Sequence, residues 1–284
     1  MSPLAVALLA LGTLLAPRQD ALTIGFLDVG QGAATIVRSP EGKVALVDGG
    51  RSSEPVARAL QSLGVDTIDL VVATHADADH IGGLEWVLRH TTVRYFLDNG
   101  MPHTTAAYRR LMQGVEESDA VYLAATDRRI TIGSVTMRVL PPPVDADDQN
   151  DASVGLLIEY GDFRALLVGD AERQELAHFL DLGVPHVSVL EASHHGALNG
   201  VTPAWIAATS PRAVLISVGR HNAYGHPDPI ALRYYATKGR VVFRTDWYGT
   251  VWVSAARDGG FTVETERTPP GDALRRTFEP EVRP

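Results

Sequence analysis

The hydrophobic and polar positions of the chain follow two different periods between residues 21 and 255. Short apolar runs that alternate with polar residues and are bounded by Gly or Pro predict β-strands. Runs with apolar residues at helical spacing, several of them beginning at Ser, Thr or Pro and ending at Gly, predict helices. Strands are expected within residues 21–29, 33–39, 43–50, 67–75, 93–99, 130–143, 153–170, 187–193, 213–219, 241–246 and 249–255. Helices are expected within residues 52–64, 81–90, 104–115, 171–183, 202–210 and 227–239.

This order of elements predicts one α/β domain over residues 22–266, with two sheets inside and helices outside, because strand runs alternate with helices and the two halves have similar content. Residues 141–151 are rich in Pro and Asp and predict an exposed loop. Residues 267–284 predict a flexible tail.

The first residues have a different pattern. Residues 3–17 are almost entirely apolar, but they are too few to span a membrane comfortably. They resemble the core of a secretory signal, although no basic residue precedes them. We therefore expect residues 1–21 to be an export or anchor segment of an extracytoplasmic protein that is secreted, periplasmic or anchored to a membrane through residues 3–17. A terminal helix packed on the domain and the end of a membrane helix from a longer protein are the alternatives.

The amino-acid composition limits the kinds of site that the chain can form. The chain of 284 residues has no Cys, which excludes disulfides, thiolate metal sites and thiol nucleophiles. Any metal must therefore be held by His, Asp or Glu. The formal net charge of −9, from 25 basic and 34 acidic residues, argues against a broad basic surface for nucleic acid. The sequence indicates no protein partner.

Four potential metal ligands follow one apolar strand directly: His75, Asp77, Asp79 and His80. In an extended segment alternate residues face the same way, so these side chains can converge. Two neighbouring carboxylates repel each other, and a divalent cation removes that cost. A strand-to-helix turn with an Asp cap is the alternative, but it does not require two His and two Asp.

The stretch THADADHIGG (residues 74–83) resembles the metal-binding motif of the metallo-β-lactamase superfamily. Asp77 stands where the commonest form has His, and this variant is typical of the hydrolase domain of ComEC-type competence DNA-uptake proteins. Further segments resemble that family in the same order: residues 26–37, 46–50, 150–172, 192–196 and 222–227. The resemblance spans about residues 22–255. It implies a four-layer αββα fold, in which two mixed sheets pack face to face with helices outside.

The resemblance also implies a binuclear site with two divalent ions, Zn²⁺ or Mn²⁺, which share a bridging hydroxide. His75 and Asp77 would hold one ion, and Asp170 would bridge both. The other ion would be held by Asp79, His80 and one of the pair His194 and His195. An N-cap of the following helix is the alternative for Asp170, and it is compatible with the ligand role.

Catalytic roles are expected for Asp79, His194, His226 and Tyr224. The sequence leaves open which of His194 and His195 is the ligand and which faces the substrate or donates a proton. Tyr224 and His226 would contact a phosphate or a leaving group. For Tyr224, a simple turn is an equal alternative.

Supporting roles are expected for Asp48, Asp28, Asn150 and Ser153. Asp48 would accept a hydrogen bond from a ligand His. For Asp28 a tight turn is an equal alternative. Asn150 and Ser153 lie where the common superfamily pattern has another His ligand. The first ion would therefore keep only His75, Asp77 and Asp170, an oxygen-rich set that favours Mn²⁺ more than an all-imidazole site does.

These residues predict a metal-dependent hydrolase, and the family resemblance favours phosphodiester bonds, with DNA as the substrate. Small phosphodiesters such as teichoic-acid or phosphocholine esters, and carboxylic esters or lactones, are the alternatives. A β-lactam fits the motif least. An alternative of another class is a metal-dependent DNA-binding module with little turnover.

Overall fold

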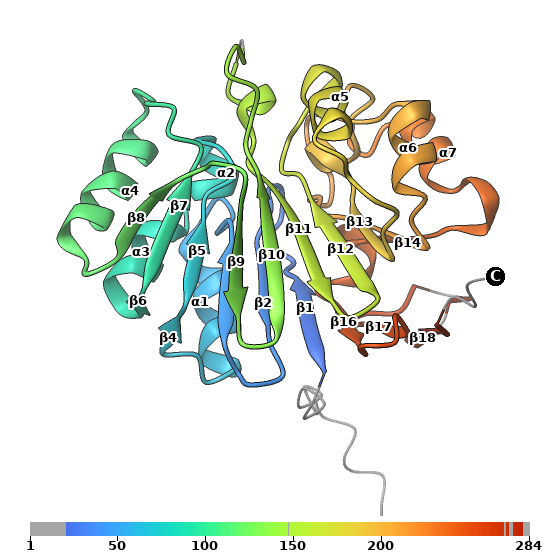
Figure 1. Ribbon diagram of the computed structural model, residues 1–284, viewed down its shortest axis with the longest axis horizontal. Coiled ribbons are helices and arrows are strands. Elements are labelled where there is room, and N and C mark those ends of the chain that lie inside the picture. Colours follow the sequence, from blue (N-terminus) through green and yellow to red (C-terminus); the bar gives the residue numbers. More distant parts are fainter. Residues whose placement is uncertain (1–20, 147, 270, 273–274, 281–284) are drawn as a thin grey trace, which may run out of the picture.

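The fold is a sandwich of two large β-sheets whose outer faces are covered by helices (Figure 1). The structure is a computed structural model that describes residues 21–280 except 147, 270, 273 and 274. The expected αββα arrangement is confirmed. Residues 1–20, which carry most of the expected export or anchor segment, lie outside the described residues.

The first sheet has nine strands. Their order across the sheet is β18 (Arg275–Phe278), β17 (Phe261–Thr265), β16 (Val251–Ala255), β1 (Leu22–Phe26), β2 (Thr35–Arg38), β3 (Val44–Val47), β5 (Leu70–Val72), β7 (Tyr95–Asp98) and β8 (Val121–Ala124). β1 and β2 pair in antiparallel fashion, whereas β3, β5, β7 and β8 run parallel to one another. β4 (Thr67–Ile68) and β6 (Thr92–Val93) form a separate small sheet.

The second sheet has seven strands. Their order is β15 (Val241–Arg244), β14 (Ala213–Ile216), β13 (Val189–Glu191), β12 (Phe163–Leu167), β11 (Gly155–Tyr160), β10 (Val135–Leu140) and β9 (Arg128–Ile132). β12 to β15 are parallel, so the segments that follow their carboxyl ends meet at one edge.

Side chains along the strands point alternately to the inner face of the sheet, toward the other sheet, and to the outer face, toward the helices. Leu22, Ile24 and Phe26 of β1 belong to the core between the sheets, which they share with Leu156 and Ile158 of β11. The intervening residues of many strands instead pack against helices. Period-two alternation therefore supplies both faces of each sheet with apolar side chains.

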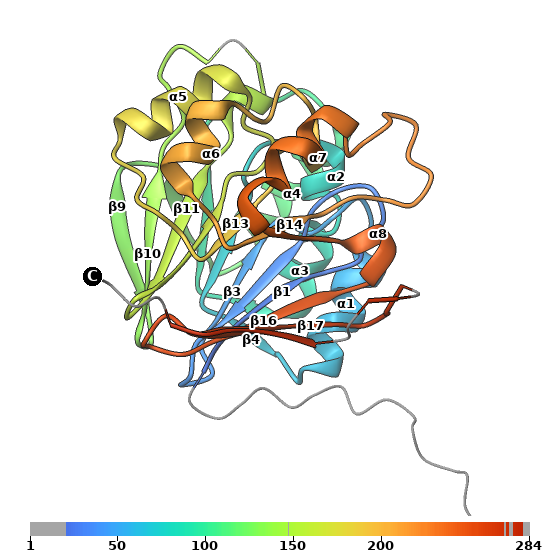
Figure 2. The same ribbon diagram turned by 90° about the vertical axis from the view of Figure 1, so that its right-hand side faces the viewer.

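The helices form the two outer layers. α1 (Ser53–Ser62), α2 (Ala78–Ile81), α3 (Leu84–His90) and α4 (Ala106–Glu117) pack on the nine-stranded sheet. α5 (Arg173–Asp181), α6 (Pro203–Thr209) and α7 (Pro229–Tyr235) pack on the other sheet, as Figure 2 shows from the side. The remaining short helices are α8 (Thr245–Tyr248) and the 3₁₀ turns η1 (Asn150–Ala152), η2 (Ser193–Gly196) and η3 (Thr237–Gly239).

Several elements differ from the sequence expectation. Where one helix was expected at residues 81–90, the structure has α2, which ends at Ile81, and α3, which begins at Leu84. Between them Gly82 and Gly83 pass so close to the backbone of Arg51 and Gly49 that a Cβ would clash. β8 is an edge strand that was not expected from the sequence. Most of its residues are exposed, so its sequence has no clear alternation of apolar and polar positions. Within the segment expected as a tail, residues 267–284, the structure has β18, which pairs with β17.

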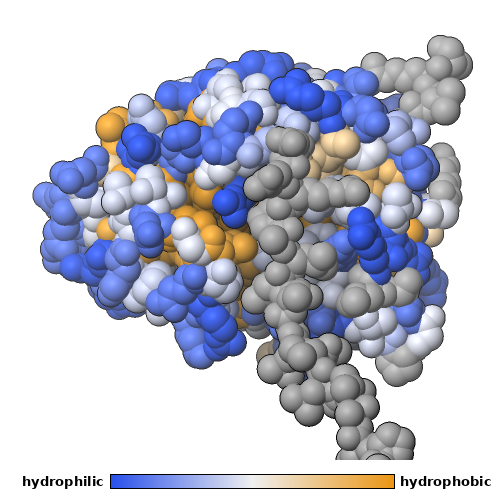
Figure 3. Space-filling view, turned by 90° about the horizontal axis from the view of Figure 1, so that it is seen from below, coloured by the Kyte–Doolittle hydropathy of each residue, from blue (hydrophilic) through white to orange (hydrophobic). Residues whose placement is uncertain are grey.

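α2 and α5 lie at the upper end of the molecule in Figure 1, where β5 and β12 deliver their carboxyl ends. Figure 3 shows the opposite end, where hydrophobic surface is visible in patches between hydrophilic residues. Within the described ranges, no helix has the length and apolar character needed to cross a bilayer.

We expect a large loss of stability when a side chain of β1 in the core between the sheets is shortened. Ile24 is 0% exposed between the sheets, so Ile24→Ala should lower the free energy of unfolding by about 2–5 kcal/mol through lost burial and a residual cavity. Urea unfolding measures this change. The matched control is Ile230→Ala, because Ile230 is 48% exposed and should change stability by about 0.5 kcal/mol or less. Equal effects of the two substitutions would contradict the assigned core.

Candidate metal centre

The residues of the expected metal motif converge at the end of β5. We use the name His–Asp cluster for His75, Asp77, Asp79, His80, Asp170, His194 and His195. His75 follows β5, and Asp77 is the residue before α2. The Asp77 side chain makes no capping hydrogen bond and instead lies 3.9 Å from Nε2 of His75. The alternative of a plain Asp cap is therefore not what the structure contains.

Asp170 is the centre of the cluster. It follows β12, and η2 with His194 and His195 follows the parallel neighbour β13. Oδ1 of Asp170 lies 3.1 Å from Nε2 of His80. Oδ2 lies 3.4 Å, 3.8 Å and 3.9 Å from Nε2 of His195, His194 and His75. Glu172, not Asp170, is the N-cap residue of α5, so the carboxylate of Asp170 is directed to the imidazoles.

Two of the imidazoles have their outer nitrogen fixed by an acceptor. Nδ1 of His80 lies 2.7 Å from Oδ2 of Asp48. Nδ1 of His195 lies 2.8 Å from the carbonyl oxygen of Ser217. A carboxylate and a carbonyl only accept, so both Nδ1 atoms carry the proton and both Nε2 atoms are directed inward. This is how ligand His residues are oriented in metal sites.

His75 provides the clearest test of whether a metal fits. Its Nδ1 lies 3.1 Å from Oγ1 of Thr74, which itself donates to Asp48 over 2.8 Å. Its Nε2 is buried and has no hydrogen-bond partner among the described residues. A buried nitrogen lone pair that faces two carboxylates is costly without a partner, and a cation supplies one. The residues present therefore fit a divalent metal ion.

Two overlapping groups have ligand atoms within 4.8 Å of one another: His75 with His80 and Asp170, and Asp79 with His80 and His195. Oδ2 of Asp79 lies 3.6 Å from Nε2 of His195, and its Oδ1 lies 3.9 Å from the Arg51 guanidinium. Between the two candidates left open by the sequence, the geometry favours His195 as the ligand.

The charges of the cluster compensate one another. Burial lowers the pKa of His75 to about 4, and the neighbouring charge of His80 adds to this effect, so His75 is neutral and its lone pair is available. Burial opposes the charge on His80, but Asp170 and Asp48 raise its pKa well above the usual value. For Asp170, burial is likewise outweighed by the imidazole charges, which hold its pKa well below the ordinary range.

Asp77 and Asp79, the two carboxylates of the motif, have pKa values shifted in opposite directions. Burial, and then the charge of Asp79, raise the pKa of Asp77. Burial also acts to raise the pKa of Asp79, but the hydrogen bond with His195 and the charge of His80 outweigh it and bring the pKa to about 2. Asp79 therefore remains ionised at any physiological pH.

The backbone around the cluster is strained. Asp48, His194 and His195 all have positive φ, at 59°, 48° and 55°, a region that non-glycine residues rarely adopt. Gly169, at φ 52°, lies so close to Thr74 and Ser153 that a Cβ would meet them at 2.9–3.0 Å. Such strain collects at functional sites, where the surrounding structure maintains it.

The residues expected to support the ligands differ in how closely they contact the cluster. Asp48 contacts His80 and Thr74 as described above. The Ser153 hydroxyl is buried, lies 3.5 Å from Nδ1 of His75 and accepts a hydrogen bond from the Asp170 amide over 3.1 Å. Nδ2 of Asn150 lies 3.5 Å from Glu172.

Asp28 agrees with the alternative of a tight turn. Its Oδ1 accepts a hydrogen bond from the amide of Gly30 over 3.4 Å, and its Oδ2 forms an ion pair with Arg267. The structure therefore assigns Asp28 to the turn and to a contact with the last part of the chain, because Arg267 competes for its carboxylate. Gln31 of the same loop accepts a hydrogen bond from the Gly219 amide over 3.1 Å.

Glu172 is a site residue that the sequence analysis missed. Its Oε1 lies 3.5 Å from Nδ1 of His194, whose Nε2 faces Asp170. Its position two residues after Asp170 was the available signal, but a helix start that is rich in acids is common. Thr74 and Ser217 were also missed, because a hydroxyl and a backbone carbonyl carry no signature of this role.

Tyr224 and His226, the two remaining residues of the expected site, lie on a loop that borders the His–Asp cluster. The rings of His226 and His194 have centroids 5.6 Å apart, and Tyr224 is stacked on His226 at 5.9 Å. Burial and then the charge of His194 lower the pKa of His226. Both residues lie beside the His–Asp cluster rather than within it.

Comparison with known proteins gives a consistent result. The family profile described as "Metallo-beta-lactamase superfamily" matches residues 27–220. The chain is 28% identical to ComE operon protein 3 of Bacillus subtilis (strain 168) over 80% of its length, and 25% identical to competence protein ComA of Neisseria gonorrhoeae over 82%. It spans about a third of either relative, at 32%.

Among solved structures, Tm1679, a metal-dependent hydrolase of the beta-lactamase superfamily, has a TM-score of 0.51 at 12% identity. That likeness covers 78% of this chain and 95% of the other. At so low an identity it shows a common fold only.

The buried acceptor of His80 predicts a measurable effect on metal binding. Asp48→Asn removes the charge that holds Nδ1–H of His80 and should weaken metal affinity about 10- to 100-fold, the usual effect of losing such a partner. Competition with a fluorescent chelator measures the affinity. Asp119→Asn, an exposed carboxylate elsewhere, is the control. Unchanged affinity in the Asp48 variant would contradict the role given to this residue.

Proposed function

Because this chain belongs to the metallo-β-lactamase superfamily of hydrolases, we propose that its His–Asp cluster holds two divalent cations and that it cleaves phosphodiester bonds. One observation supports this most strongly. A single buried carboxylate, Asp170, has four imidazole nitrogens within 4 Å of its two oxygens. A carboxylate with two oxygens suits a position between two cations.

The geometry suggests how the ligands divide. We assign His75, Asp77 and Asp170 to one ion, because Asp77 and Asp170 both lie 3.9 Å from Nε2 of His75. Asp79, His80 and His195, whose ligand atoms lie within 4.8 Å of one another, are assigned to the other. The first set has two carboxylates and one imidazole, which favours Mn²⁺ more than the second set does, although Zn²⁺ suits both.

Bound cations would acidify a water molecule and neutralise the charge that builds on the phosphoryl oxygens. The chain itself supplies orientation and protons. Asp48 and the Ser217 carbonyl hold the Nδ1–H groups of His80 and His195, so that the Nε2 atom of each imidazole is directed inward as the ligand atom. His194 is 21% exposed at the edge of the cluster, with Nδ1 beside Glu172, and its Nε2 is the atom we assign to proton donation to the leaving oxygen.

For the substrate we propose DNA. The resemblance to the ComEC hydrolase domain and the relative named as a competence protein support it. A competence role would place the site outside the cytoplasm, consistent with the expectation for residues 1–21. The excess of 34 acidic over 25 basic residues favours instead a small phosphodiester that needs few basic contacts.

Loss of a ligand should remove both metal and turnover. His75→Ala and Asp170→Ala are expected to lower hydrolysis of bis(p-nitrophenyl) phosphate by more than the roughly 100-fold that loss of a supporting residue can cause. Elemental analysis of the purified variants should show reduced metal. His90→Ala, an exposed imidazole outside the cluster, is the control. Full metal and full rate in either cluster variant would refute the assignment.

A substrate panel separates the alternatives. Rapid turnover of a small phosphodiester, ester or lactone without action on DNA would favour the small-substrate enzyme. Binding of DNA without cleavage under Mn²⁺, Zn²⁺ and chelator would favour the binding module.

A further inference from the structure

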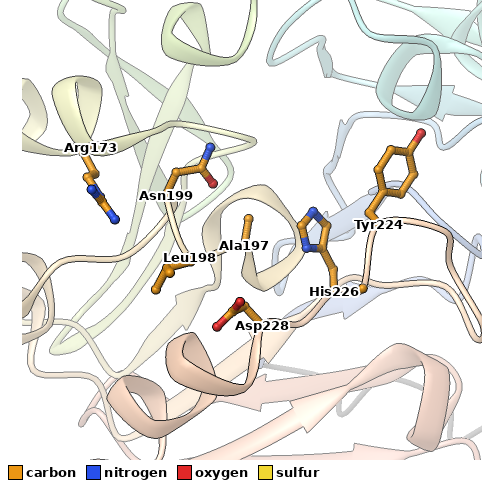
Figure 4. A pocket seen from close by; sticks show the side chains of 8 residues that line it. Arg173, Ala197, Leu198, Asn199, Tyr224, His226 and Asp228 are labelled. Atoms are coloured by element: carbon orange, nitrogen blue, oxygen red, sulfur yellow. The ribbon is translucent and has the colours of Figure 1, made fainter.

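Figure 4 shows a hollow of about 390 Å³. It lies beside the His–Asp cluster, because the ring of His226 in its lining is 5.6 Å from the ring of His194. It is lined by Arg173, Ala197, Leu198, Asn199, Tyr224, Gly225, His226 and Asp228. Its size suits one nucleotide or a similar small group, since ligand pockets begin at about 300 Å³.

Two walls of this hollow continue directly from cluster segments. Arg173 is the first residue of α5, three residues after Asp170, and Ala197 comes two residues after His195. The third wall is the loop with Tyr224 and His226. Any group held here is therefore adjacent to a bond that is attacked at the cluster.

Tyr224 presents an exposed aromatic face. Its side chain is among the large apolar groups at the surface, with 62% exposure, and its ring is nearly parallel to that of His226, at 14°. Asn222 keeps the loop in shape, because its side chain donates to the carbonyls of Gly219 and His226 and accepts from the amides of Tyr224 and His226. A rigidly held exposed ring is the element on which proteins stack unpaired bases.

Arg173 supplies a cation at the opposite side of the hollow (Figure 4). Among the described residues its guanidinium has no ion-pair or hydrogen-bond partner, unlike Arg51 beside Asp79. Asp228 also lines the hollow, but its Oδ1 accepts hydrogen bonds from the amides of Ile230 and Ala231 as the cap of α7. An uncompensated guanidinium in a concave site is suited to bind a phosphate.

We propose that this hollow binds the nucleotide next to the cleaved phosphate of a single-stranded nucleic acid, with its base stacked on Tyr224 and its phosphate against Arg173. The inference rests on the proposed function, which it makes more specific. Bases in a duplex are stacked on each other and cannot offer a face to Tyr224. Tyr224 therefore makes the site selective for unpaired strands, while Arg173 adds affinity for the phosphate.

The test measures binding instead of turnover. A labelled thymidine strand of about 12 nucleotides with phosphorothioate linkages, which slow hydrolysis, is titrated with the metal-loaded full chain. Tyr224→Ala should weaken binding about 10-fold, and Tyr224→Phe should restore it because the ring returns. Tyr95→Ala, which removes a 44% exposed ring on β7, should leave affinity unchanged.

Salt dependence separates the two residues. Arg173→Gln should reduce the slope of log affinity against log salt by about 0.7, the value for one phosphate contact on a single strand. Tyr224→Ala should leave this slope unchanged, and so should the control Arg128→Gln on β9.

Wild-type affinity for the matching duplex should be at least 10-fold weaker than for the single strand. Equal affinity for both forms, or unchanged binding in both Tyr224→Ala and Arg173→Gln, would overturn the inference. Hydrolysis of bis(p-nitrophenyl) phosphate by the wild-type chain is measured separately and decides the proposed function. The two ideas can therefore fail independently.

Discussion

The buried Asp170 carboxylate, surrounded by imidazole nitrogens, is the contact on which the rest of the site depends. Four nitrogens lie 3.1–3.9 Å from its two oxygens, and the surroundings exclude most water. In such a place a charge is stable only when it is paired. The fold meets this requirement because parallel β12 and β13 bring Asp170 and η2 to one edge, opposite the segment that follows β5.

A second layer of hydrogen bonds explains why the cluster has one arrangement. Asp48 accepts from Thr74 and from His80, while the Ser217 carbonyl fixes His195. These contacts define which nitrogen of each imidazole faces inward, and the strained backbone at Asp48 is the cost of placing that carboxylate there. The open side of the cluster leads to His194, His226 and the hollow, so rigid ligands and substrate-facing groups occupy different sides.

The local parts of the site could be predicted from the residue pattern itself, whereas the distant ligands could be predicted only through the family resemblance. The motif at residues 74–83 carries its ligands within one short segment, and strand periodicity indicated two sheets with helices outside. Asp170 and the pair His194 and His195 could be assigned only because several distant segments resemble the family in the same order. The Ser217 carbonyl, the role of Glu172 and the ion pair of Asp28 with Arg267 depend on chain crossings that no local pattern encodes. β8 and β18 were missed because edge strands lack a buried face to impose alternation.

Anomalous X-ray diffraction from crystals grown with Mn²⁺ tests the central claim most directly. The account predicts two anomalous peaks, one between His75 and Asp170 and the other between Asp79 and His195, with Asp170 touching both. A cluster without any peak in Mn²⁺-saturated crystals, or peaks only elsewhere on the molecule, would contradict it.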